Sequence, residues 1–169
     1  MDGTNNKNKG WDLLSKALKI VASKLPNAIA VIFGQSYGNH SDEINMPIIY
    51  IGKLNDPQSL AMLYSAADIT VVPSRMESFG QTASESISCG TPVIAFDCTG
   101  IRDLIIHNKT GFLVEPYNYI YLSKFIIEIL QNNSKMNIFK IACRERAVKL
   151  WSYKSISRKY FDLYSKVLN

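Results

Sequence analysis

The chain has 169 residues and a formal net charge of +5, with 47% hydrophobic and 20% charged residues. This length suffices for one domain with a sizeable core, and the composition is that of a globular protein rather than a disordered or collagen-like one. No apolar run approaches the roughly 18 residues that a membrane-spanning helix needs, and the polar start MDGTNNKNKG lacks the apolar stretch of a signal peptide.

Apolar residues then recur at helical and at strand-like spacing in alternation. Leu14, Ala17, Leu18, Val21 and Leu25 mark a first helix over residues 10–25. Apolar runs bounded by glycine, proline or polar residues predict five strands, at residues 28–33, 48–51, 69–72, 93–96 and 111–114. Between the strands we expect a polar loop at residues 35–46 and helices at residues 55–67 and 102–107. Another helix is expected to open near residues 79–80 and to carry Glu85 in its second turn. After residue 119 the pattern is helical in two or three pieces, with breaks near residues 132–134 and 152–153.

Strands that alternate with helices predict a parallel sheet. We therefore expect an α/β fold, namely a Rossmann-like parallel sheet with helices on both faces, followed by C-terminal helices. Residues 1–169 are expected to form a single domain. The aromatic side chains between residues 151 and 164 are interpreted as contacts for helix packing.

Two further features bear on where the protein resides. The three cysteines, Cys89, Cys98 and Cys143, form no C-x-x-C pair, which favours reduced thiols in a cytoplasmic protein and argues against a zinc site. Residues 135–169 hold nine basic residues against two acidic ones. This basic end has two interpretations: solvated helix faces, or a surface for anionic lipid headgroups at the inner face of a membrane. Nothing in it resembles a nucleic-acid-binding motif.

The most informative stretch is PSRMESFGQTASESISCGTPVIAF, residues 73–96. Glu77 follows a strand, and Glu85 lies in the second turn of a helix that opens near Phe79 and Gly80. Both residues are therefore expected near the carboxyl ends of the parallel strands, where α/β sheets bind ligands. The N-terminus of the helix favours an anion at the same place. Two carboxylates beside an anion site can accept hydrogen bonds from ligand hydroxyls that flank the anionic group. A nucleotide diphosphate sugar has such hydroxyls on both sides of its diphosphate. The alternative is a pair of solvated surface glutamates.

This stretch resembles the E-x7-E segment of family-four retaining glycosyltransferases of the GT-B fold (glycosyltransferase group 1), written E-x-F-G-x-x-x-x-E. The matching residues are Glu77, Phe79, Gly80 and Glu85. Upstream, KGWDLL (residues 9–14) resembles the K-G-x-x-x-L start of the domain's first helix. Downstream, GTPVIA (residues 90–95), GIRDLI (residues 100–105) and NKTGFLV (residues 108–114) resemble further segments of the family. The resemblance covers nearly the whole chain, in the family's order.

The resemblance implies a role for each of these residues. Lys9 would contact the donor diphosphate and offset the charge of the leaving group, and Glu77 would hold donor-sugar hydroxyls near the reacting carbon; these are the expected catalytic residues. Glu85 would accept hydrogen bonds from ribose hydroxyls. The other expected substrate-binding residues lie at the start of the Glu85 helix and after a strand, namely Ser78, Phe79, Gly80, Gln81, Ile51, Lys53 and Leu54. The implied chemistry is retaining transfer, in which the departing phosphate oxygen helps to deprotonate the acceptor.

The sequence contains no D-x-D, so we expect neither a metal nor another cofactor, with helix N–H groups and lysine holding the diphosphate. The family's second basic residue would fall near Gly3, where no arginine stands. The GT-B domain also has a strand before the K-G helix, central in the strand order 3-2-1-4-5-6, which the polar residues 1–8 do not supply. We therefore expect the acceptor domain and this strand to be absent from the chain. The two strands that would flank this missing strand then have exposed edges. Either these two strands pair directly, or something else fills the gap between them.

The sequence thus predicts the donor-binding domain of a retaining glycosyltransferase. It would move a hexose from a nucleotide diphosphate sugar to an acceptor, in polysaccharide or glycolipid synthesis, and the isolated domain is expected to be inactive. The alternatives are a nucleotide-sugar epimerase of similar fold and a non-catalytic nucleotide-sugar-binding module. The expected partners are the nucleotide sugar, the missing acceptor domain and, through the basic helices, a membrane surface; nucleic acid is not expected.

Overall fold

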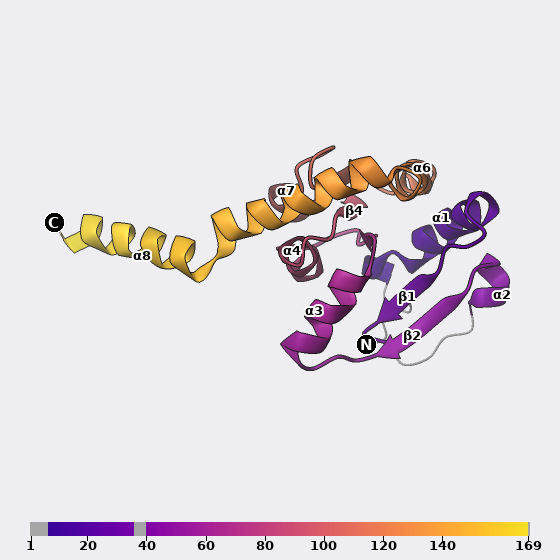
Figure 1. Ribbon diagram of the computed structural model, residues 1–169, viewed down its shortest axis with the longest axis horizontal. Coiled ribbons are helices and arrows are strands. Elements are labelled where there is room, and N and C mark those ends of the chain that lie inside the picture. Colours follow the sequence, from indigo (N-terminus) through magenta and orange to yellow (C-terminus); the bar gives the residue numbers. More distant parts are fainter. Residues whose placement is uncertain (1–6, 36–39, 169) are drawn as a thin grey trace.

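The computed structural model of the chain describes residues 7–35 and 40–168. Its strands are β1 (Ala30–Phe33), β2 (Ile48–Gly52), β3 (Thr70–Val72), β4 (Val93–Phe96) and β5 (Gly111–Val114). Its helices are η1 (Lys7–Lys9), α1 (Trp11–Lys24), α2 (Ser41–Ile44), α3 (Pro57–Ala66), α4 (Gln81–Ser88), α5 (Ile101–Leu104), α6 (Tyr119–Leu130), α7 (Asn133–Trp151) and α8 (Tyr153–Leu168). The predicted alternation of strands and helices is confirmed, and Figure 1 shows α8 extending away from the remainder.

The described strands pair in parallel, but they form two sheets. β1 pairs with β2, and a separate three-stranded sheet has the order β3-β4-β5. The α/β class is confirmed. Direct pairing of the strands that flank the missing one does not occur within residues 7–35 and 40–168, because no ladder joins β1 to β3. Helices rather than strand pairing therefore hold the two sheets together.

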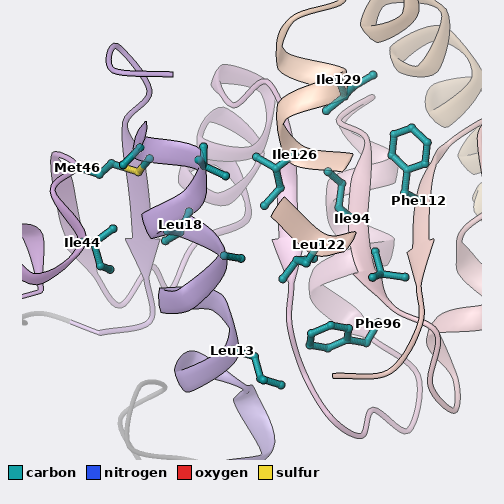
Figure 2. Close-up of a cluster of buried hydrophobic side chains, with 14 of the residues drawn as sticks. Leu13, Leu18, Ile44, Met46, Ile94, Phe96, Phe112, Leu122, Ile126 and Ile129 are labelled. Carbon is teal, nitrogen blue, oxygen red and sulfur yellow. The ribbon is translucent and has the colours of Figure 1, made fainter. Parts of the chain in front are cut away.

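One hydrophobic core bridges the two sheets through α1 and α6. Figure 2 shows Leu18 of α1 and Ile126 of α6 among the side chains of this core, with Ile94 of β4 and Phe112 of β5 beyond them. Ile48 of β2 also packs, partly buried, against this cluster. Burial of these side chains removes apolar surface from water, which is the main favourable term in folding.

β4 is buried on both of its faces. Ile94 and Phe96 belong to the core under α1 and α6, whereas Val93 and Ala95 belong to a second cluster with residues of α4, α5 and α7. Successive side chains of a strand point to opposite faces, so helices cover both faces of this sheet, as predicted. Burial on both faces also explains why residues 93–96 are an uninterrupted apolar run.

Two sequence-based predictions were wrong in whole or in part. Residues 35–46 are not a continuous loop, because α2 forms there and Ile44 and Met46 are buried in the core; residues 36–39 lie outside the described residues. The prediction of helix packing for the aromatic residues holds for Trp151, which packs partly buried against the second cluster, but not for those of α8, since α8 has no buried residue and Tyr153 is 97% exposed. The chain turns at Ser152, whose extended backbone (ψ 151°) ends α7 and directs α8 away from the sheets. Among the helices of the described residues, none is both long and apolar enough to cross a bilayer.

Candidate functional site

Gly10 fixes the position of Lys9. Its backbone is left-handed (φ 68°), and it is the N-cap of α1. A Cβ atom at this position would lie 1.9 Å from the carbonyl oxygen of Pro73, the residue that follows β3. Only glycine therefore lets the start of α1 touch the carboxyl end of β3. This contact brings Lys9, at the end of η1, beside the loop that carries Glu77.

Lys9 and Glu77 form an ion pair at this edge. The Nζ atom of Lys9 donates a hydrogen bond of 2.8 Å to Oε1 of Glu77, and the hydroxyl of Ser74 donates to the same oxygen at 2.7 Å. The Lys9 side chain is 51% exposed and the Glu77 side chain 18%. The ammonium is therefore open to a ligand, while the carboxylate is held in a sheltered place. The structure thus joins the two residues that were predicted to be catalytic.

Arg75 ties the same loop to the first helix. Its guanidinium donates two hydrogen bonds to the carboxylate of Asp12, at 2.9 and 2.7 Å, and another to the carbonyl oxygen of Lys7. The hydrogen bonds from Arg75 lower the pKa of Asp12, and the same contact raises the pKa of Arg75. The planar fork of arginine suits this bidentate contact with a carboxylate. Sequence reasoning missed this pair, which joins the loop before Glu77 to α1 and to η1, the helix that ends at Lys9.

The loop that begins at Glu77 leads to an open helix N-terminus. The Glu77 carbonyl oxygen accepts hydrogen bonds from the N–H of Gly100 at 3.0 Å and from the hydroxyl of Thr99 at 2.5 Å. Gly80, with a left-handed backbone (φ 90°), is the N-cap of α4 and offers no side-chain cap. The first N–H groups of α4 thus lack intrahelical partners, and together with the helix dipole they favour an anion at this end.

Glu85 lies on α4 in a pocket of about 510 Å³. Its Oε2 atom accepts a hydrogen bond of 2.9 Å from the hydroxyl of Tyr64, a residue of α3 that is 2% exposed. Burial, and secondly the hydrogen bond to Glu85, raise the pKa of Tyr64, so the phenol remains a donor at neutral pH. The other lining residues come from α3 and the turn before it, from α4 and its entry, and from α7, namely Asn55, Pro57, Leu60, Ala61, Phe79, Ser84, Ser88, Cys89 and Trp151.

The predicted substrate-binding residues are only partly brought together. Phe79 and Glu85 line the same pocket. Ser78 and Gln81 are exposed at the entry to α4, next to Gly80. The segment of Ile51, Lys53 and Leu54 ends β2 and precedes the pocket-lining residues Asn55 and Pro57, but none of its three predicted residues lines the pocket. Gly3 lies outside the described residues.

Sequence reasoning missed the pocket residues Tyr64, Cys89 and Trp151. A tyrosine in an apolar helix and a tryptophan at a helix end carry no local signal of ligand contact. Among the residues that the structure describes, no group of three His, Cys, Asp or Glu side chains could hold a metal ion. His107 makes a structural contact, because its Nδ1 atom accepts a hydrogen bond of 3.2 Å from the N–H of Leu113.

Each of the two glutamates is held by the described residues through one carboxylate oxygen only. Lys9 and Ser74 hold Oε1 of Glu77, and Tyr64 holds Oε2 of Glu85. No donor from residues 7–35 or 40–168 reaches the second oxygen of either carboxylate. Each carboxylate is therefore oriented by the protein and still able to accept a hydrogen bond. Along the chain, the start of α4, the end of the helix that favours an anion, lies between these two residues.

Comparisons with known proteins identify the family of the chain. A family model described as glycosyl transferases group 1 matches residues 3–146. The D-inositol 3-phosphate glycosyltransferase of Thermobispora bispora is 34% identical over 110 residues, which cover 64% of this chain and 25% of that protein. The chain therefore spans about a quarter of the length of this relative.

Solved structures show the same fold. The sucrose-phosphate synthase from Thermosynechococcus elongatus superposes with a TM-score of 0.82 and 29% identity, covering 96% of this chain and 43% of that one. The Anabaena protein Alr3699/HepE in complex with UDP superposes with a TM-score of 0.81 over 95% of this chain and 46% of that one. Its identity is 21%, so this second likeness concerns the fold alone.

Proposed function

Because the chain belongs to the family of glycosyl transferases group 1, we propose that it is the donor-binding domain of a retaining hexosyltransferase. Its donor is a nucleotide diphosphate hexose, and its product is part of a polysaccharide or a glycolipid. Structures of the Anabaena neighbour hold UDP and UDP-glucose, which supports a UDP-linked donor here.

The observation that carries the proposal is the pair of carboxylates, one before and one after the start of α4 in the chain, each of which is held by the protein through one oxygen. A nucleotide diphosphate sugar has hydroxyls on the ribose, then two phosphates, then hydroxyls on the hexose. The open oxygen of Glu85 suits the ribose, the N–H groups of α4 suit the diphosphate, and the open oxygen of Glu77 suits the hexose. The pocket of about 510 Å³ beside Glu85 has room for the nucleoside.

Lys9 stabilises the departing phosphate in this proposal. An ammonium group has three donors, and one of them is used by Glu77. The others are free to meet phosphate oxygens where negative charge builds up as the bond to the sugar breaks. The departing phosphate oxygen then takes the proton of the acceptor hydroxyl. Lys9 and Glu77 are the catalytic residues on this chain, and the chemistry needs no metal.

A thermal-shift screen of the chain against nucleotide sugars tests the proposal. A ligand that binds only the folded state stabilises it by about 2.7 kcal/mol at a hundredfold excess over Kd. We expect UDP and UDP-hexoses to raise the unfolding temperature and AMP to leave it unchanged. The absence of a shift with every nucleotide sugar, in a chain shown to be folded by circular dichroism, would contradict donor binding.

We further propose that the chain alone transfers no sugar, because it supplies only the donor side of the site. Incubation with UDP-hexoses and an acceptor lipid or glycan should yield no glycoside. Addition of the acceptor-binding part of the enzyme should produce one with retained configuration, detected by NMR of the anomeric proton. Epimerised UDP-sugar as the product would instead identify an epimerase, and tight binding without turnover would identify a binding module.

A membrane surface is the second partner in this proposal. α8 carries Lys154, Arg158, Lys159 and Lys166, and its apolar side chains are exposed, with Phe161 at 68% and Leu168 at 85%. A helix that combines basic and exposed apolar side chains can lie in the headgroup region of a bilayer. Such a contact would place the chain at the inner face of a membrane, beside a lipid-linked acceptor.

A further inference from the structure

Thr99 has a backbone conformation that its residue type disfavours. It lies in the loop between β4 and α5, and its φ is 34°. Among the described non-glycine residues with a positive φ it is the β-branched one, whereas the others are Asn45, Asn108 and Tyr117. A branched side chain in this region collides with its own backbone, and such strain clusters at functional sites. Thr99 is exposed, so burial in the core does not offset the strain.

The hydroxyl of Thr99 holds the backbone of Glu77 through both of its polar groups. The oxygen accepts a hydrogen bond of 3.0 Å from the N–H of Glu77, and the hydroxyl donates one of 2.5 Å to the Glu77 carbonyl oxygen. The same carbonyl oxygen accepts a hydrogen bond of 3.0 Å from the N–H of Gly100. Within residues 7–35 and 40–168, no second acceptor reaches the N–H of Glu77. These hydrogen bonds are what a strained threonine contributes at this position.

The loop that carries Thr99 is itself anchored. At its start, the N–H of Asp97 donates a hydrogen bond of 2.6 Å to the carbonyl oxygen of Val114 in β5. The carboxylate of Asp97 forms an ion pair of 2.6 Å with Arg102 of α5. The loop is therefore tied to a strand on one side and to a helix on the other. Thr99 can thus act as a fixed support for the neighbouring loop after β3.

The side-chain contacts of Glu77 show why a support of its backbone matters. Its Oε1 atom accepts hydrogen bonds from Lys9 and Ser74. A bound diphosphate attracts the ammonium of Lys9 as well, so this contact depends on whether a ligand is present. The hydroxyl of Thr99 is uncharged and holds backbone atoms, so its contacts do not depend on the charge of a ligand. The backbone of Glu77 therefore keeps its support when a donor binds.

We propose that Thr99 is a positioning residue for the carboxylate that binds the hexose. Its hydroxyl fixes the backbone of Glu77, and thereby the direction in which the Glu77 side chain leaves the loop. Without the hydroxyl, the N–H of Glu77 turns to water, which does not fix its position. The carboxylate then meets the hexose hydroxyls less well, while the remainder of the donor keeps its contacts. The part played by the hexose rests on the proposed function, whereas the hold on Glu77 rests on the hydrogen bonds alone.

Hydrogen exchange in the ligand-free chain tests the hold on Glu77. Thr99→Val removes the hydroxyl and keeps the branched shape, whereas Thr99→Ser keeps the hydroxyl and is the matched control. By NMR, the amide proton of Glu77 should exchange roughly two- to tenfold faster in Thr99→Val, as expected for a lost hydrogen bond. The amide protons of β4 should keep their original rates, and Thr99→Ser should exchange like the original chain throughout. Equal rates for Glu77 in the three proteins would overturn the proposal.

Titration calorimetry tests the consequence for the donor. Thr99→Val should bind UDP like the original chain and UDP-glucose roughly two- to tenfold more weakly. Thr99→Ser should bind both ligands like the original chain, because it retains the hydroxyl. A variant that merely loosens the fold would weaken the binding of both ligands. Equal losses for UDP and UDP-glucose in Thr99→Val, or no loss for either, would overturn the proposal.

Thr99→Gly separates the hydroxyl from the strained backbone, and it replaces Thr99→Val if circular dichroism shows that variant to be unfolded. Glycine adopts the observed φ of 34° without strain, but it has no hydroxyl. We therefore expect fast exchange at Glu77 and weaker binding of UDP-glucose. Original behaviour in Thr99→Gly would mean that the shape of the turn positions Glu77, and would overturn the proposal. An original chain that binds neither UDP nor UDP-glucose would contradict the proposed donor, and the exchange rates would still decide the role of Thr99.

Discussion

Lys9 donates a hydrogen bond of 2.8 Å to Glu77 although 68 positions separate the two residues in the sequence. The contact of Gly10 with Pro73 and the paired hydrogen bonds between Arg75 and Asp12 hold the two segments together. Lys9, which is expected to contact the diphosphate, and Glu77, which is expected to contact the sugar, therefore have a fixed relative position. This arrangement makes the roles of the two glutamates separable by experiment.

Glu85→Gln should weaken UDP and UDP-glucose alike, because both ligands carry the ribose that Glu85 is proposed to hold. A hydrogen bond to a charged group contributes about 1.5–3 kcal/mol, or roughly ten- to hundredfold in Kd. Titration calorimetry with both ligands gives the two affinities. Glu145→Gln, at an exposed position on α7, makes the same chemical change as a control and should alter neither. Unchanged affinities in Glu85→Gln would assign Glu85 to the surface of the pocket rather than to the ligand.

Glu77→Gln should spare UDP and weaken UDP-glucose, since Glu77 is proposed to contact the hexose only. The same calorimetric experiment measures both affinities. In the assembled enzyme the variant should also lower kcat, because orientation of the sugar matters most in the transition state. Equal losses for UDP and UDP-glucose would mean that Glu77 acts through Lys9 and the diphosphate instead.

Donor binding should survive chelation of metals. The proposed contacts to the diphosphate are N–H groups of α4 and the ammonium of Lys9, neither of which needs a divalent cation. Titration calorimetry measures the affinity for UDP-glucose in buffer with EDTA, with magnesium and with manganese, and we expect the three values to agree. A large loss in EDTA that either cation restores would refute this description of the diphosphate site.

Asp12→Asn should destabilise the protein at neutral pH by less than about 1 kcal/mol, because the Asp12 side chain is 59% exposed and screened by water. Arg75 holds the pKa of Asp12 below its ordinary value, so the stabilisation is present above about pH 4 and is lost as the pH falls through the lowered folded-state pKa. Urea unfolding at pH 7 and near pH 2 should show the difference between the two proteins vanish in acid. A difference that persists in acid would exclude the ion pair as its cause.

The chain should sediment with vesicles that contain phosphatidylglycerol and not with pure phosphatidylcholine vesicles. The basic residues of α8 supply the attraction, which salt should weaken, and Phe161 supplies exposed apolar surface. Phe161→Ser should reduce sedimentation, whereas Ile138→Ser on α7 should not. Failure to bind anionic vesicles would assign the exposed face of α8 to a protein partner.

The sequence was most informative where residues close together in the chain determine the structure. The strand over residues 93–96 follows from a short apolar run and was predicted with its observed bounds, and the start of the helix around Glu85 was predicted within one or two residues. α2 was missed because one helical turn is too short to show a periodic pattern.

Long-range contacts were beyond such reasoning. The pairing of Arg75 with Asp12 and the hydrogen bond from Tyr64 to Glu85 join segments whose positions depend on the packing of several helices. The separation of the two sheets is of the same kind. The sequence indicated two exposed strand edges, but only the packing of α1 and α6 decided that the edges stay apart.

The Gly10–Pro73 contact restricts which sequences can evolve around this site. A carbon atom at position 10 would meet the Pro73 carbonyl oxygen at 1.9 Å, and the left-handed backbone there already disfavours other residues. Selection for donor binding would therefore act on a residue that has no side chain and touches no ligand. A lysine exchanged for arginine at position 9 adds no atom at this contact, whereas any replacement of Gly10 forces the start of α1 and the Pro73 segment to shift relative to each other.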